Sequence, residues 1–197
     1  MSKITLAPNA SGTGTLTVAA PNTNSDYTLT LPAETGTVLT SASSIPTSQL
    51  SGTVVGNGPA FRATLSSTQT LATTVTTKVQ LNSEDFDTAN CYDTSTYRFT
   101  PNVAGYYQVN MNIQIGQSNF TGAIVGRVYK NGSDVRVVET ATVSTTSAYP
   151  NVAGSFMIYM NGSTDYLELY AYQNSGGNRT IYGTIYSEFS AFLARAA

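Results

Sequence analysis

The stretch from Gly105 to Ile115 constrains the fold of this chain most, because polar and apolar side chains alternate there without interruption. The apolar side chains of one parity are Tyr107, Val109, Met111, Ile113 and Ile115. The side chains of the other parity are Tyr106, Gln108, Asn110, Asn112 and Gln114. Because successive side chains leave opposite faces of a pleated strand, this period predicts a β-strand buried on one face. The other face is polar yet uncharged, which is unusual for a strand bathed in water.

The region 59–197 is predicted to contain only β-structure. Two Asn-Gly pairs lie between apolar runs, Asn131-Gly132 and Asn161-Gly162, and each predicts a β-hairpin because both turn residues can adopt a positive φ. No stretch of about ten residues shows the helical period. About eight to ten strands of this kind indicate an all-β sandwich or jelly roll.

The stretch 180–193 predicts a long final strand that is apolar on both faces. One face would carry Ile181, Ile185, Phe189 and Leu193, and the other Tyr182, Tyr186 and Phe192. A strand that is apolar on both faces is buried on both. A second sheet covers one face, and a further copy of the chain would cover the other, so this stretch predicts an oligomer. The alternative is that a loop covers the outer face.

The first part of the chain predicts short strands and a linker. Residues 1–41 contain brief apolar runs (15–19, 27–31 and 36–39) separated by turn-forming residues, too short to form a core alone. Three copies wound together could share one. Residues 42–58 are rich in Ser, Gly and Pro and predict a linker or partly extended stalk.

Composition excludes several functions. The chain has no histidine and one cysteine, so Ser-His-Asp triads, Cys-His dyads, ordinary zinc sites and an internal disulfide are excluded. Charged residues make up only 10% of the 197 residues and the net charge is −2, without a basic patch for nucleic acid. The sequence shows no apolar core of a signal peptide. It also has no apolar run of about 18 residues, which a transmembrane helix would need. We expect no catalytic residues, no cofactor and no enzymatic activity.

An acidic segment, 83–95, is predicted to be an irregular loop. It contains Glu84, Asp85, Asp87 and Asp93, whose oxygens could suit Ca²⁺, although their spacing is not that of an EF-hand. A solvated loop without metal is the favoured interpretation, and calcium binding stays open. Cys91 lies among these acids, which predicts an unreactive thiol.

Thirteen tyrosines and no tryptophan are present. Tyr92, Tyr149 and Tyr172, which are in or near predicted loops, could contact a bacterial surface glycan through their rings and hydroxyl groups. The alternative is that most tyrosines occupy sheet surfaces and subunit contacts, where an amphipathic ring suits a half-buried position.

The spacing of six residues between Leu81 and Tyr107 resembles the signature of the globular head of complement C1q. The matching positions are Leu81, Asp87, Tyr92, Phe99, Gly105 and Tyr107. The chain departs from the signature at Leu81 and Val109, where phenylalanine is usual. Residues 163–169 (STDYLEL) and 187–193 (SEFSAFL) also resemble the last strands of that family.

This resemblance covers residues 59–197 and implies a trimeric jelly roll similar to tumour necrosis factor. In that family the strand 105–115 and the last strand lie in an inner sheet that faces the threefold axis. The resemblance therefore implies a homotrimer with subunit contacts at Tyr106, Gln108, Asn110, Tyr182, Tyr186 and Phe192. Neutral amides suit an axis, because identical charges meeting there would repel.

Residues 1–41 resemble the N-terminal modules of bacteriophage fibres, on the stretches GTGTLTVAAPNTNSDYTLTLP and ETGTVLTS. The two resemblances together imply a virion structural protein, made in the host cytoplasm. Its N-terminal segment would join other virion proteins, and its head would attach a trimeric tail fibre or spike to the host surface. The alternatives are a capsid decoration or head-fibre protein, and a lectin-like extracellular adhesin that is not viral.

Overall fold

The computed structural model describes residues 11–13, 22–26, 28, 58–116, 119–139, 143–145 and 149–197. The chain divides into two compact units, Met1–Ser43 and Ser44–Ala197. The short strands expected in residues 1–41 and the stalk expected in 42–58 lie almost entirely outside the described residues. In the described ranges every regular element is a strand, and no helix there is long and apolar enough to span a membrane.

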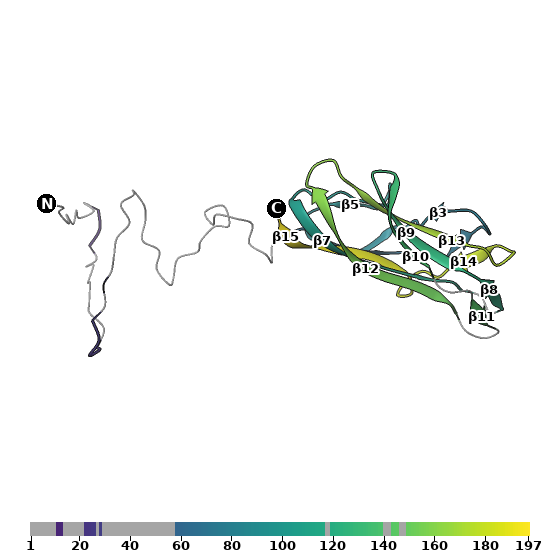
Figure 1. Ribbon diagram of the computed structural model, residues 1–197. Coiled ribbons are helices and arrows are strands. Elements are labelled where there is room, and N and C mark those ends of the chain that lie inside the picture. The colour runs from purple at the N-terminus through teal and green to yellow at the C-terminus, as the bar shows by residue number, and fades with distance from the viewer. Residues whose placement is uncertain are drawn as a thin grey trace. The chain divides into compact units, whose positions relative to one another are not determined.

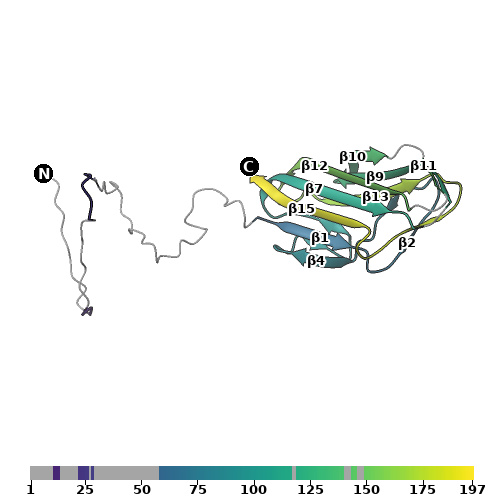
Figure 2. The same cartoon turned by 90° about the horizontal axis from the view of Figure 1, so that it is seen from below.

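A five-stranded antiparallel sheet forms one layer of the head. Its order is β12 (Asn151–Asn161), β7 (Ala104–Gln114), β15 (Glu188–Ala196), β1 (Ala60–Thr64) and β4 (Ser83–Asp87). Figure 2 looks onto this sheet, with β7 and β15 at its centre. The predicted strand 105–115 is β7, and its prediction as a strand is confirmed. The predicted acidic loop is wrong in part, because Glu84, Asp85 and Asp87 lie on edge strand β4.

The second layer is a six-stranded sheet. Its path is β10 (Ser133–Glu139), β9 (Ile124–Lys130), β13 (Leu167–Gln173), β6 (Arg98–Phe99) and β5 (Tyr92–Asp93), and β3 (Thr77–Lys78) also pairs with β13. Two small sheets pair β8 (Phe120–Gly122) with β11 (Val143–Thr145), and β2 (Gln69–Leu71) with β14 (Arg179–Ile181). The two layers are visible in Figure 1. The predicted all-β jelly-roll class is confirmed.

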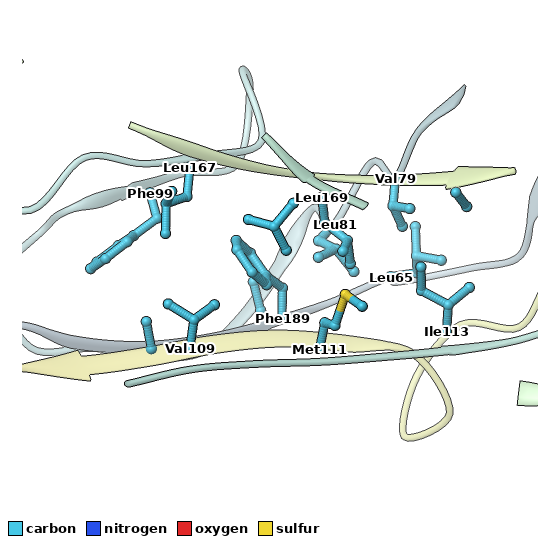
Figure 3. Close-up of a cluster of buried hydrophobic side chains, with 14 of the residues drawn as sticks. Leu65, Val79, Leu81, Phe99, Val109, Met111, Ile113, Leu167, Leu169 and Phe189 are labelled. Atoms are coloured by element: carbon cyan, nitrogen blue, oxygen red, sulfur yellow. The ribbon is translucent and has the colours of Figure 1, made fainter. Parts of the chain in front are cut away.

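The core lies between the two large sheets. Val109 and Met111 point from β7 toward the layer that carries Leu167 and Leu169 of β13, and Ile113 points into the core near Leu65 and Val79 (Figure 3). All five apolar residues predicted for the buried parity of the 105–115 stretch are at most 2% exposed. Phe61 anchors one end of the core, because its ring stacks on the rings of Tyr92 at 4.7 Å and Phe99 at 4.5 Å.

Only one of the two Asn-Gly pairs forms the predicted β-hairpin. Asn131 and Gly132 have φ values of 54° and 82° and join β9 to β10 as a hairpin, as predicted. Asn161-Gly162 does not make a hairpin, because β12 and β13 belong to different sheets. There the side-chain Oδ1 of Asn161 accepts hydrogen bonds from the backbone N–H groups of Ser163, Thr164 and Asp165, so the chain turns from one layer to the other.

The prediction of one long final strand is wrong. The stretch 180–193 is divided between β14 and β15 by a turn at 182–187, in which Thr184 has a φ of 57°. Ile185, expected in the core, is 76% exposed. In β15, Phe189, Ala191 and Leu193 are buried, whereas Phe192 is 47% exposed. The alternation of buried and exposed side chains therefore resumes in β15, after the turn. Because the strand is interrupted, the apolar pattern of 180–193 no longer implies that its outer face is buried.

Candidate functional site

The outer face of the five-stranded sheet carries an exposed apolar cluster. We define the outer patch as Tyr106, Met157, Tyr159 and Phe192, which are between 42% and 56% exposed. The strand register brings them together, because Met157 and Phe192 flank Gln108 on either side and Tyr159 is opposite Tyr106. The rings of Tyr106 and Tyr159 make an edge contact with centroids 5.6 Å apart.

Neutral amides continue this face along β7. The side-chain N–H of Gln108 donates to Ser155 Oγ at 2.7 Å, and that hydroxyl donates to Asn110 Oδ1 at 2.8 Å. Farther along, Asn151 donates to Asn112 Oδ1 at 3.2 Å. These bonds tie β12 to β7 and fix the orientation of each amide, so the face is ordered within one subunit.

The charges at the β1–β4 side of the same face compensate one another. The guanidinium of Arg62 contacts the carboxylate of Asp85 at 2.8 Å and that of Glu188 at 2.6 Å. The outer patch is therefore bordered on that side by charges that are paired with one another, and on β15 the exposed Arg195 lies opposite Tyr106.

The outer face of the six-stranded sheet is different, because it carries charged side chains that form ion pairs. Glu168 is 2% exposed, and its Oε1 contacts Lys78 Nζ at 2.6 Å and Arg98 Nε at 2.8 Å. Burial would raise the pKa of Glu168, but the hydrogen bonds and positive charges of Lys78 and Arg98 outweigh it, so the pKa lies below its ordinary value. Arg127 and Asp134 add another ion pair at 2.7 Å.

The two outer faces can therefore do different things. In a rotationally symmetric assembly about one axis, identical patches approach one another, so unpaired like charges repel whereas apolar rings and neutral amides do not. The outer patch and the amides beside it would bring only uncharged side chains together, whereas contact through the other face would bury its ion pairs, which costs desolvation.

The acidic residues of 83–95 are engaged within the chain. Asp85 pairs with Arg62, and Asp87 accepts hydrogen bonds from the backbone N–H groups of Ala89 and Tyr92. Asp93 accepts from Ser95 and Thr96, and these hydrogen bonds hold its pKa well below the usual range. Within the part of the chain that the structure describes, no group of three or more His, Cys, Asp and Glu residues is arranged to hold a metal ion.

Cys91 is buried in this region. Burial raises the pKa of its thiol to about 12, and the negative charge of Asp87 adds to the effect. The thiolate is the nucleophilic form, so the thiol is poorly suited to nucleophilic chemistry near neutral pH.

The three tyrosines proposed for glycan contact have different environments. Tyr92 is only 6% exposed and its hydroxyl donates to the Leu81 carbonyl at 2.9 Å, so the expectation that it reaches a ligand is wrong. Tyr172 is half-buried on β13, in the other sheet. Tyr149 is 50% exposed and lies beside Tyr182, with ring centroids 5.5 Å apart.

The residues expected at the threefold axis separate into two groups. Tyr106, Gln108, Asn110 and Phe192 lie together on the outer face of the five-stranded sheet. Tyr182 and Tyr186 lie in the turn at 182–187, at the end of that sheet, and group with Tyr149 instead. Sequence reasoning missed Met157 and Tyr159, although the alternation in 151–161 could have revealed β12 as a partner of β7.

Comparisons with known proteins support the fold alone. No protein-family model and no curated sequence matches the chain. The structure is similar to the globular domain of zebrafish complement 1qA protein, at 17% identity and a TM-score of 0.53, covering 71% of this chain and 99% of that one. It is also similar to Eiger TNF from S. frugiperda, at 10% identity and a TM-score of 0.53, covering 71% and 93% of the two chains.

Proposed function

We propose that this chain is a non-enzymatic structural protein whose head associates as a homotrimer through the outer patch and attaches to a surface. The observation that carries the proposal is the outer patch together with the neutral amides along β7, on the outer face of the five-stranded sheet. This face exposes Tyr106, Met157, Tyr159 and Phe192 next to ordered amides, whereas the opposite face is charged. Covering these side chains with copies of themselves removes apolar area from water, and the amides beside them carry no charge that would repel its copies.

The setting that fits best is a bacteriophage virion. This part rests on the resemblance of residues 1–41 to the N-terminal modules of phage fibres. In the proposal, three N-terminal segments bind another virion protein, and the heads project from the particle toward the bacterial surface. Three heads on one stalk raise avidity, because the second and third contacts form at high effective concentration.

The trimer is tested by the mass of the full chain in solution, measured by light scattering. We expect three times the chain mass of 20.8 kDa. The double substitution Tyr106→Asp with Phe192→Asp should give monomers, because charges introduced near the axis repel and lose hydration. Val137→Asp is the matched control, since Val137 is 45% exposed on β10 of the other sheet. A wild-type monomer, or a double variant that stays trimeric, would show that the patch is not the interface.

The setting is tested by labelling phage particles with an antibody against the head and viewing them by electron microscopy. Label at the tail supports the fibre, and label over the capsid supports a decoration or head-fibre role. Absence of the chain from particles contradicts a virion protein and leaves a non-viral adhesin. Binding of the purified full chain to intact bacteria tests attachment separately.

A further inference from the structure

Three tyrosines converge at the end of the five-stranded sheet where β7 finishes. Tyr149 precedes β12, and Tyr182 and Tyr186 lie between β14 and β15. Tyr182 is central, with its ring centroid 5.5 Å from that of Tyr149 and 5.6 Å from that of Tyr186. Tyr149 and Tyr186 are 50% and 46% exposed, so their rings remain open to a ligand. We call these three residues the tyrosine cluster.

The tyrosine cluster borders a hollow of about 360 Å³. Its lining includes Ser67, Thr68, Gln114, Tyr149, Tyr182 and Tyr186. This volume lies within the range of about 300–1,000 Å³ that is typical of small-molecule sites. The side chains that line it are uncharged and offer aromatic faces beside hydroxyl and amide groups.

Hydrogen bonds hold the backbone of the turn that carries Tyr182 and Tyr186. The N–H of Tyr182 donates to the Gln114 carbonyl at 2.9 Å, and the side chain of Asn112 donates to the Tyr186 carbonyl at 2.6 Å. The N–H of Thr184 donates to the Leu65 carbonyl at 2.6 Å, which holds the turn that carries the rings of Tyr182 and Tyr186. The ring of Tyr182 also packs on the backbone of Gly116, where a methyl group would overlap it. A site held in this way loses little conformational entropy on binding.

The chemistry of the lining selects its ligand. An ionic ligand would leave its charge without a partner in the hollow, and a purely apolar ligand would leave hydroxyl and amide groups unpaired. A neutral sugar has both properties that the lining needs, because its C–H face can stack on an aromatic ring while its hydroxyl groups exchange hydrogen bonds. Burial and the neighbouring Tyr149 raise the pKa of the Tyr182 hydroxyl above its ordinary value, so this group offers a neutral hydroxyl to a ligand.

We infer that the tyrosine cluster and its hollow bind one or two residues of a neutral saccharide. The inference rests on the proposed attachment function and names its ligand class, but it does not depend on the trimer. In this inference the exposed rings of Tyr149 and Tyr186 contact the sugar, and the ring of Tyr182 lies between them. Tyr186 thereby acts in ligand binding rather than at the threefold axis.

The inference is tested with the full chain on an array of defined neutral and acidic oligosaccharides. Neutral oligosaccharides should bind and acidic ones of the same backbone should bind more weakly. Tyr149→Ala and Tyr186→Ala should each weaken binding by about tenfold or more, equivalent to about 1.4 kcal/mol. Because the chain has no tryptophan, titrations can be followed by tyrosine fluorescence. Tyr172→Ala is the matched control on the other sheet, and it should bind like the wild type.

Other outcomes separate the two proposals. Binding that is unaffected by Tyr149→Ala and Tyr186→Ala, or no binding of any neutral oligosaccharide, overturns the inference. If the two variants instead lose the trimeric mass, the cluster is a subunit contact and the inference is also overturned. Wild-type attachment to bacteria that survives both substitutions keeps the proposed function but removes the hollow from it. If the wild type does not attach to cells at all, the proposed attachment fails.

Discussion

Replacing Glu168 by Gln should destabilise the head more than any comparable loss of a surface carboxylate. The Glu168 side chain is 3% exposed and accepts from Lys78 at 2.6 Å and from Arg98 at 2.8 Å. Glutamine keeps the shape but removes the charge that both cations face. The substitution leaves two positive groups side by side without their common partner.

The magnitude follows from how far the two cations can return to water. Removing one member of a fully buried ion pair costs about 3–5 kcal/mol. Here the side chains of Lys78 and Arg98 are 26% and 41% exposed, so they regain part of their hydration. We therefore expect a loss of about 2–3 kcal/mol in the free energy of unfolding. For a domain of this size the melting temperature should fall by roughly 5–10 °C.

The measurement is denaturant unfolding of wild type and variant at one fixed protein concentration, because oligomers gain stability with concentration. Asp134→Asn is the control, since it removes the carboxylate of a more exposed pair in which Asp134 is 37% and Arg127 28% exposed. Its expected cost is about 0–1 kcal/mol. If Glu168→Gln costs no more than Asp134→Asn, the ion pairs of Glu168 do not stabilise the fold and the reasoning is refuted.

The pH dependence of the same variant gives an independent check. The folded-state pKa of Glu168 lies below its ordinary value of 4.5, so its contribution is fully present above that pH. The contribution is lost as the pH falls through the folded-state pKa, because the carboxyl then takes up a proton in both states. The stability difference between wild type and Glu168→Gln should therefore shrink as the pH falls below 4.5. A difference that stays constant down to acid unfolding would contradict the lowered pKa.

Met111→Asp should unfold the head, because Met111 is 2% exposed and an unpaired buried charge costs several kcal/mol; circular dichroism with an unchanged melting temperature would refute the orientation of β7. Gly162→Ala should cost about 1–3 kcal/mol, because φ is 72° there and the new methyl group would meet the backbone of Ala104; thermal unfolding measures the loss, and Gly177→Ala, where nothing lies nearby, is the control. Cys91 should resist alkylation by iodoacetamide at pH 8 while the protein is folded and react after denaturation, because burial raises its pKa to about 12; labelling of the folded chain detected by mass spectrometry would contradict this.

The sequence alone determined the class of fold and the buried face of its central strand. The alternation in 105–115 specifies which side chains are buried, since a pleated strand has only two faces. Tyr107, Val109 and Ile113 are accordingly fully buried. The Asn131-Gly132 hairpin was likewise predictable, because its turn chemistry is local. Composition excluded triads and ordinary zinc sites for the same reason, since absent residue types need no geometry to be absent.

Only the tertiary structure decided how these strands are arranged and which side chains share a surface. Asn161-Gly162 carries the same local signal as Asn131-Gly132, but β12 and β13 pair in different sheets, and no local pattern encodes that choice. The sequence pattern of 180–193 did not reveal the turn, because apolar residues continue to alternate there even though the backbone leaves the sheet between β14 and β15. Tyr149 and Tyr182 are far apart along the chain and become neighbours only where β7, β12 and β15 end together. The surfaces proposed for assembly and for binding therefore depend on strand pairing between distant segments, which the sequence pattern does not specify.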